Sequence, residues 1–372
     1  MAIDIYTDDY YCFISAYIIA SHAKKECLIL KAYKTDFDSY KDQKVTAFHL
    51  ENDNGVRVTV LSQGGIIAEM SVPTKDGQHK NMLLEYPHTA DYYANPFYVN
   101  MMIGTAAGRI KKGEFTINGK TTKVTPNEGQ NTLHGGPNGF HSVNWDGELE
   151  SNTSDARLTL NHHFDSNPGD FPAISVTVTY TLKNDNTLGV QFTGESDEAT
   201  IFNPTYHTYF NVSDEATIKN QTLQLNSHRH MDVDTEKIPT GKMLDNTNTA
   251  FDFTTPQKLG TAIDKMQDTT EKGFDDIFEV EPSSTDQTIA KLSDDASKRA
   301  VTLHSSRNGL VVFTANSFTP DMNLTLGKGA PYMGVALEAQ NLSDATRFEN
   351  LGDITLQPGV PKSYEIKYQL SF

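Results

Sequence analysis

The sequence predicts an all-β protein with the architecture of a large antiparallel β-sandwich. Short segments in which apolar and polar residues alternate recur at intervals of roughly 8 to 12 residues, separated by Gly, Asn and Asp. Helical periodicity is nearly absent, because only residues 91–95 and 255–265 suit short helical turns. No repeat of about 20 to 50 residues is evident, which argues against a β-propeller.

The expected strands are spread over the chain after residue 45. They share β-branched and aromatic residues, a period of two and turn residues at their ends. The clearest hairpin is 115–124, where Asn118-Gly119 supplies a two-residue turn that strongly favours antiparallel pairing. The other segments with the strand pattern are 56–61, 66–72, 156–160, 174–181, 188–193, 222–225, 300–303, 310–315 and 363–370.

Composition argues against several classes of function. The 372 residues are 37% hydrophobic and 21% charged, as in soluble globular proteins. With 31 basic and 48 acidic side chains the net charge is −17, so we expect neither nucleic acid nor a membrane as partner. Both cysteines, Cys12 and Cys27, precede Lys31, so no disulfide framework or cysteine-based zinc site is expected after it. A reducing cytoplasm fits this pattern.

Residues 1–44 are interpreted as an N-terminal extension of unknown role, and residues 45–372 as one large domain. The apolar stretch 12–20 is far shorter than the roughly 20 residues that span a bilayer. Three aspartates precede it where a secretory signal carries positive charge, so a signal peptide is not expected.

The most unusual segment is 202–212, with sequence FNPTYHTYFNV. As a strand, it places Thr205, His207, Tyr209 and Asn211 on one face, which is polar and contains a titratable group. A strand with one solvated face explains this pattern. A strand that presents a proton donor to a ligand is the alternative, but these residues alone favour the solvated face.

Two other segments carry candidate functional residues. His134 precedes paired glycines in a loop whose glycines allow sharp turns and close approach of the backbone to a ligand. Glu338 lies within the apolar segment 332–340, where a carboxylate is costly unless it is paired, functional or turned toward water. The phosphate-loop ending and the Gly-x-Ser-x-Gly elbow are both missing. The tight histidine pairs have no nearby ligand set, so no metal is expected.

Taken together, these segments resemble the aldose 1-epimerases, or galactose mutarotases. The resemblance runs from about Thr46 to Phe372, and its motifs occur in the family's order: 104–110 (GTAAGRI), 131–136 (NTLHGG), 203–211 (NPTYHTYFN), 238–241 (IPTG), 250–253 (AFDF), 273–275 (GFD) and 337–340 (LEAQ). It implies a β-sandwich with a sugar site in an open cleft. It also implies interconversion of α and β anomers of free aldoses such as galactose and glucose, with no cofactor or metal, and leaves open whether maltose is a substrate.

The resemblance also implies roles for individual residues. By position, His207 is the general acid and Glu338 the general base. The implied sugar contacts are Arg109, His134, Asp275 and Tyr209. This chain departs from the pattern of many members at Asp276 and from that of some members at Val311 and Gly108, which affects the expected sugar preference.

The implied reaction explains why these residue types are needed. Ring opening of a hemiacetal removes a proton from the C1 hydroxyl while the ring oxygen gains one. Histidine titrates near neutral pH and suits the acid, whereas an ionised glutamate suits the base. A carboxylate near His207 is expected to favour the charged imidazolium, which is a ready donor.

Three alternatives remain at this point. The first is a domain that binds carbohydrate without turning it over. The second is a hexose-phosphate epimerase, for which Lys111-Lys112 beside Arg109 is the candidate phosphate clamp. The third is a glycosidase with Glu338 and Asp275 as its two carboxylates. Either a monomer or a homodimer is compatible with the sequence.

Overall fold

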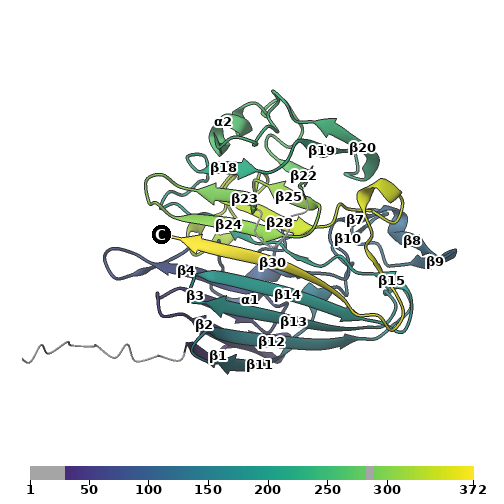
Figure 1. Cartoon of the computed structure of the whole chain (residues 1–372), viewed down its shortest axis with the longest axis horizontal. Helices are drawn as coiled ribbons and strands as arrows, with labels where there is room; N and C mark the ends of the chain where they lie inside the picture. The colour runs from purple at the N-terminus through teal and green to yellow at the C-terminus, as the bar shows by residue number, and fades with distance from the viewer. Residues whose placement is uncertain (1–29, 282–287) are drawn as a thin grey trace, which may run out of the picture.

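The computed structural model describes residues 30–281 and 288–372, and they form layers of antiparallel strands (Figure 1). This confirms the predicted all-β class and the β-sandwich. The apolar stretch 12–20 and both cysteines lie outside the described residues. The largest sheet has nine strands, and in Figure 1 it can be followed from β11 through β30 to β18. In spatial order these are β11 (Asp146–Ser151), β12 (Asp155–Phe164), β13 (Ile174–Lys183), β14 (Thr187–Glu195), β30 (Lys362–Ser371), β24 (Ala300–Ser305), β23 (Thr288–Ser293), β18 (Thr222–Leu225) and β21 (Gln257–Lys258).

Two smaller sheets complete the main framework. The five-stranded sheet contains, in order, β1 (Lys31–Tyr40), β2 (Gln43–Glu51), β3 (Arg57–Leu61), β4 (Ile67–Pro73) and β5 (His79–Asn81). The six-stranded sheet contains β17 (Tyr209–Phe210), β28 (Val335–Gln340), β25 (Gly309–Phe313), β22 (Asp275–Glu279), β19 (Arg229–Val233) and β20 (Pro239–Asp245). A bridge between Leu83 and Phe210 joins these regions. Strand β1 falls within the range 1–44 and pairs with β2 along its length.

The remaining elements are short. The paired strands are β6 (Met102–Ile103) with β16 (Thr205–Tyr206), β7 (Arg109–Ile110) with β10 (Thr132–Leu133), β8 (Glu114–Ile117) with β9 (Lys120–Lys123), β15 (Thr200–Ile201) with β29 (Thr355–Leu356), and β26 (Asn323–Leu324) with β27 (Gly327–Lys328). The helices are α1 (Thr89–Tyr93), α2 (Leu259–Asp264), η1 (Lys111–Gly113), η2 (Phe140–Ser142) and η3 (Glu349–Leu351). No helix in the described part of the chain is both long and apolar enough to cross a membrane.

Most of the strands expected from the sequence are present with small shifts at their ends. The hairpin of β8 and β9 is confirmed, and Asn118 and Gly119 have φ of 51° and 77° at its turn. Positive φ at both central residues is what a type I′ turn requires, and Asn-Gly adopts it readily. The two expected helical turns overlap α1 and α2.

The segment 202–212 differs from the expected strand. It forms two two-residue strands, β16 and β17, with His207 and Thr208 between them. The first pairs with β6 and the second with β28, so the chain changes partners at His207. Every residue from 202 to 212 is buried. The interpretation of a solvated face is therefore wrong, because neighbouring elements cover both sides of the segment.

The core explains how β28 presents a polar group. Val335, Leu337 and Ala339 pack into the main apolar cluster, together with residues of the nine-stranded sheet. Ala336 belongs to a second apolar cluster. Because side chains alternate along a strand, Glu338 shares the face of Ala336 and points away from the sandwich core. A carboxylate is thereby placed on a fully buried strand without entering the main core.

Candidate active site

A cavity of about 310 Å³ lies on this outer face of the six-stranded sheet. Its walls come from β28, β25 and β22 and from loops that precede and follow β7 and β10. All six residues that the sequence pointed to line this one cavity: Arg109, His134, His207, Tyr209, Asp275 and Glu338. Their segments are far apart in the sequence, so only the fold brings them together.

Glu338 lies near the middle of β28, between β17 and β25. Its side chain is 2% exposed, and Oε2 has no hydrogen-bond partner within the described residues. Burial raises the pKa of Glu338 well above its usual value, and the negative charge of Asp275 adds to this, while Arg109 opposes it. A carboxylate with these properties has a high affinity for a proton.

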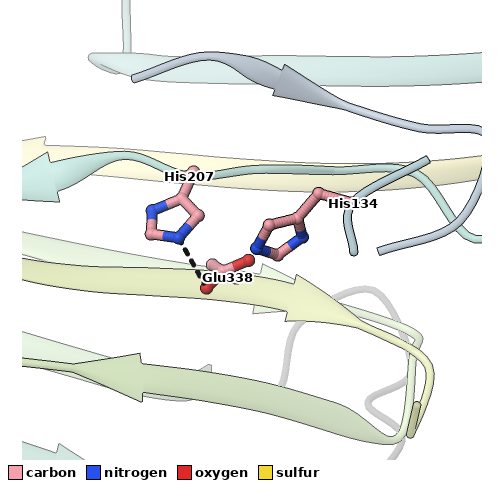
Figure 2. Close-up of side chains that lie close together, drawn as sticks. All are labelled: His134, His207 and Glu338. Carbon is pink, nitrogen blue, oxygen red and sulfur yellow. Dashed lines mark ion pairs between the residues drawn. The ribbon is translucent and has the colours of Figure 1, made fainter. Parts of the chain in front are cut away.

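His207 faces this carboxylate directly. Its Nε2 lies 3.4 Å from Oε1 of Glu338, as the dashed line in Figure 2 shows, and its side chain is 8% exposed. The backbone is fixed on both sides, since His207 N–H donates to Met101 O and its carbonyl accepts from Asn100 N–H. Burial lowers the pKa of His207 to about 3. Burial therefore works against the charged imidazolium that the nearby carboxylate was expected to favour.

His134 approaches the same point from the loop after β10 (Figure 2). Its ring meets that of His207 edge to face, with centroids 5.3 Å apart. Gly108 N–H donates to Nδ1 of His134 at 3.3 Å, which assigns the ring proton of a neutral His134 to Nε2. Burial lowers the pKa of His134, and the neighbouring His207 adds to this. His134 is thus a neutral donor at the cavity.

One departure from the family pattern has a structural reason. Gly108 has φ of +75°, and a Cβ at this position would lie 2.2 Å from Oγ of Ser343. A larger residue would require Ser343 to move and the backbone to change. Of the other two departures, Val311 lines the cavity opposite Glu338, and the Asp276 carboxylate accepts the backbone N–H of Asp275.

The two predicted charged sugar contacts are both ion-paired. Nε and Nη2 of Arg109 bond to the Glu128 carboxylate at 2.5 and 2.8 Å. Asp275 begins β22, and its Oδ2 lies 3.6 Å from Nζ of Lys237. Glu128 and Lys237 both line the cavity, yet the sequence reasoning missed them. The available signal was their position, since each lies close in sequence to a recognised motif.

Tyr209 packs against His207, and its hydroxyl points to the backbone of Phe97. The rings stack with centroids 5.0 Å apart and an interplanar angle of 21°. The Tyr209 hydroxyl donates to Phe97 O at 2.9 Å, so that hydrogen is already used. Tyr98 was also missed; its ring lies edge-on to His134 at 5.0 Å and forms part of the cavity wall. A single aromatic in a loop gives no local signal of such a role.

Arg307 joins the segments that carry His207 and Glu338. This arginine is 2% exposed and donates to the carbonyl oxygens of Pro204 and Ala339. Its guanidinium also lies over the ring of Tyr364, 4.9 Å from the centroid. Burial lowers the pKa of Arg307 to about 10. Because Pro204 precedes His207 by three residues and Ala339 follows Glu338, Arg307 fixes their segments relative to each other.

The donor atoms of His134, His207 and Glu338 lie within 4.8 Å of one another, so this trio could hold a metal ion. Zinc binds nitrogen and oxygen at about 2.0–2.2 Å, which brings tetrahedral donors to roughly 3.3 Å from one another. The side chains would therefore have to draw together around an ion. The trio is more simply arranged for proton transfer and hydroxyl binding.

Comparison with known proteins identifies the family. The sequence model described as aldose 1-epimerase matches residues 46–369. A maltose epimerase of Levilactobacillus brevis is 38% identical over 340 residues, which cover 90% of this chain and 98% of that protein. Human galactose mutarotase is 30% identical over 320 residues, covering 85% and 91% respectively.

Comparison of the structures identifies the same family. The crystal structure of galactose 1-epimerase from Lactobacillus acidophilus superimposes with a TM-score of 0.81 at 27% identity, and the match covers 92% of this chain and 99% of that one. The resemblance stated from the sequence motifs is confirmed. The chain belongs to the aldose 1-epimerase family of isomerases.

Proposed function

We propose that this chain interconverts the α and β anomers of free aldoses, using His207 as general acid and Glu338 as general base. Galactose and glucose are the expected substrates, and maltose is a further candidate because a close relative is named a maltose epimerase. The observation that carries the proposal is the buried pair itself, with Nε2 and Oε1 3.4 Å apart in a cavity lined by hydroxyl-binding groups.

The proximity of the pair suits the reaction. The oxygen of the C1 hydroxyl and the ring oxygen are both bonded to C1, so an acid and a base that serve them must lie close together. Glu338 takes the proton of the C1 hydroxyl, and protonated His207 gives a proton to the ring oxygen as the C1–O bond breaks. Rotation about C1–C2 follows in the open chain. On reclosure at the other face of the carbonyl, the ring oxygen returns its proton to His207, and Glu338 returns its proton to the oxygen on C1.

The other residues orient the sugar. His134 can donate from Nε2, and Asp275 accepts from hydroxyls. Arg109 carries five N–H donors, of which the pair with Glu128 uses two, so it can donate further while its plane stays fixed. Holding the ring in one position turns proton transfer into a step within a single complex.

The phosphate alternative receives less support. Lys111 and Lys112 lie in η1 and are not among the residues that line the cavity. The cations that do line it, Arg109 and Lys237, are each paired with carboxylates. A phosphate would have to compete with these carboxylates for both cations.

Anomeric exchange measured by proton NMR tests the proposal. Wild-type protein should accelerate exchange of galactose and glucose above the buffer rate, and His207→Gln should lower the acceleration by roughly 10²–10⁴-fold. Circular dichroism checks that the variant is folded. Saturable sugar binding without acceleration would instead favour the carbohydrate-binding alternative.

We further propose that the activity resides in residues 45–372 of a cytoplasmic protein that is a monomer or a homodimer and binds no nucleic acid. The position of both cysteines before Lys31 and the net charge of −17 support this proposal. Size-exclusion chromatography with light scattering measures the oligomeric state.

A further inference from the structure

One buried hydroxyl in the wall of the cavity has no part in the proposed proton transfers. Ser343 lines the cavity and lies in the loop after β28, five residues beyond Glu338. It is 1% exposed, which is comparable to the 2% exposure of the Glu338 side chain. A polar group buried this deeply needs hydrogen-bond partners, so the partners of Ser343 show what else it can bind.

The protein satisfies the Ser343 hydroxyl only in part. Nε2 of Gln340, which is fully buried, donates to Oγ of Ser343 at 2.9 Å. A serine hydroxyl has one O–H donor and two acceptor lone pairs. Among the residues that the structure describes, the hydrogen of this hydroxyl has no acceptor. Ser343 can therefore donate to a ligand in the cavity while Gln340 holds its oxygen in place.

The loop that carries Ser343 is tied to neighbouring segments. The N–H of Asn341 donates to Oδ1 of Asn203 at 2.9 Å, and Nδ2 of Asn203 donates back to Asn341 O at 3.0 Å. The N–H of Leu342 donates to Oδ1 of Asn308 at 3.1 Å. Because these bonds fix the backbone before Ser343, little conformational entropy would be lost when its hydroxyl binds a ligand.

Gly108 leaves free the space that Ser343 occupies. A Cβ on Gly108 would lie 2.2 Å from Oγ and 2.8 Å from Cβ of Ser343. A side chain at position 108 and the Ser343 hydroxyl thus compete for one place, which connects the departure at Gly108 with the hydroxyl at position 343. The N–H of Gly108 donates to His134, and Arg109 is the next residue. Ser343 is therefore close to the segments that carry two of the proposed sugar contacts.

We propose that Ser343 binds one hydroxyl of the reacting aldose, at a carbon other than C1, and is thereby a specificity-determining residue. This proposal rests on the proposed epimerase function. Ser343 moves no proton; it distinguishes aldoses by whether the hydroxyl that it meets is present. An aldose without this hydroxyl would leave the buried serine without a partner for its hydrogen, so it should be a poorer substrate.

The test combines Ser343→Ala with sugars that lack single hydroxyls. Anomeric exchange is measured by proton NMR for glucose and for 2-, 3-, 4- and 6-deoxyglucose. Ser343→Ala should lower kcat/KM for glucose roughly three- to tenfold, as expected from losing one hydrogen bond. The same factor should apply to three of the deoxy sugars and should disappear for the fourth, because that sugar has no hydroxyl for Ser343 to bind.

A second variant separates the hydrogen bond from packing. Ser343→Cys keeps nearly the same shape but replaces the hydroxyl with a weak donor, so it should show the same pattern as Ser343→Ala. A Ser343→Cys protein that behaves as wild type would show that packing alone matters and would overturn the proposal. Ser363→Ala is the matched control, because this serine is exposed on β30 and its loss should change the rate for none of the sugars.

The outcomes separate this proposal from the one on which it rests. If Ser343→Ala lowers kcat/KM for all five sugars by the same factor, Ser343 only supports the cavity wall, and this proposal is wrong while the epimerase stands. An unchanged kcat/KM for glucose in Ser343→Ala would contradict it equally. Absence of acceleration by wild type for every sugar would overturn both proposals.

Discussion

Replacing Glu338 by Gln tests the chemistry and the energetics of the site in one variant. Gln has almost the same shape and can occupy the place opposite Nε2 of His207, where the two side chains now lie 3.4 Å apart. It cannot take a proton from the C1 hydroxyl. Loss of a general base lowers the rate by roughly 10²–10⁴-fold, which corresponds to about 2.7 to 5.4 kcal/mol of the barrier.

The same change should increase stability at neutral and alkaline pH. Burial raises the pKa of Glu338, so between the unfolded pKa of about 4.3 and the higher folded pKa the native protein binds one proton more than the unfolded chain. The free energy of unfolding of wild type therefore falls as pH rises through this window, by at most about 1.4 kcal/mol per pH unit from this group. Gln does not titrate, so the free energy of unfolding of the variant should rise relative to that of wild type as pH increases.

Anomeric exchange of galactose by NMR and urea unfolding at pH 5, 6, 7 and 8 measure the two effects. Glu148→Gln is the matched control. The carboxylate of Glu148 is exposed on β11, so this substitution should change neither the exchange rate nor the pH dependence of stability. A Glu338→Gln protein that retains more than about a third of the wild-type rate would refute the base assignment. If its stability did not rise relative to wild type between pH 5 and pH 8, the argument from burial would be wrong.

Two further variants test other parts of the structure. Arg307→Met should lower kcat about 10- to 100-fold, because it removes the hydrogen bonds to the carbonyls of Pro204 and Ala339. Arg307→Lys should recover part of the activity, and KM should change little in either variant. An unchanged kcat would show that the positions of His207 and Glu338 do not depend on Arg307. His141, whose pKa burial lowers to about 4, should make wild type less stable as pH falls from about 6.5, because the unfolded chain then binds the extra proton. In His141→Gln the pH slope of the unfolding free energy, measured with urea from pH 4.5 to 7, should be shallower by up to about 1.4 kcal/mol per unit; equal slopes would contradict this.

Local signals in the sequence predicted the parts of the fold that are themselves local. Asn118-Gly119 specifies its hairpin because the turn residues alone favour the required backbone angles. The alternation along β13 and β14 likewise matches their burial. The break at His207 was not predictable in this way, because it arises where the chain exchanges β6 for β28 as its partner.

The site shows the same division. The motifs indicated His207 and Glu338, whose residue types fit the chemistry. The Arg109–Glu128 pair joins residues 19 apart, and the contact of Lys237 with Glu271 joins two distant loops. No feature of the sequence indicated the position of Arg307, since its guanidinium donates to backbone carbonyls, which any sequence supplies. Such contacts depend on which segments the fold brings together.

Burial of His207 and Glu338 also connects the fold to the proposed reaction. It disfavours both the imidazolium of His207 and the carboxylate of Glu338, as the directions of their pKa shifts show. In the proposed mechanism, ring opening begins with these two charged forms and leaves both groups neutral, because the proton of the C1 hydroxyl reaches Glu338 while His207 gives its own to the ring oxygen. In that mechanism the step that forms the open chain removes two buried charges, so the burial of the pair favours the intermediate through which the anomers exchange.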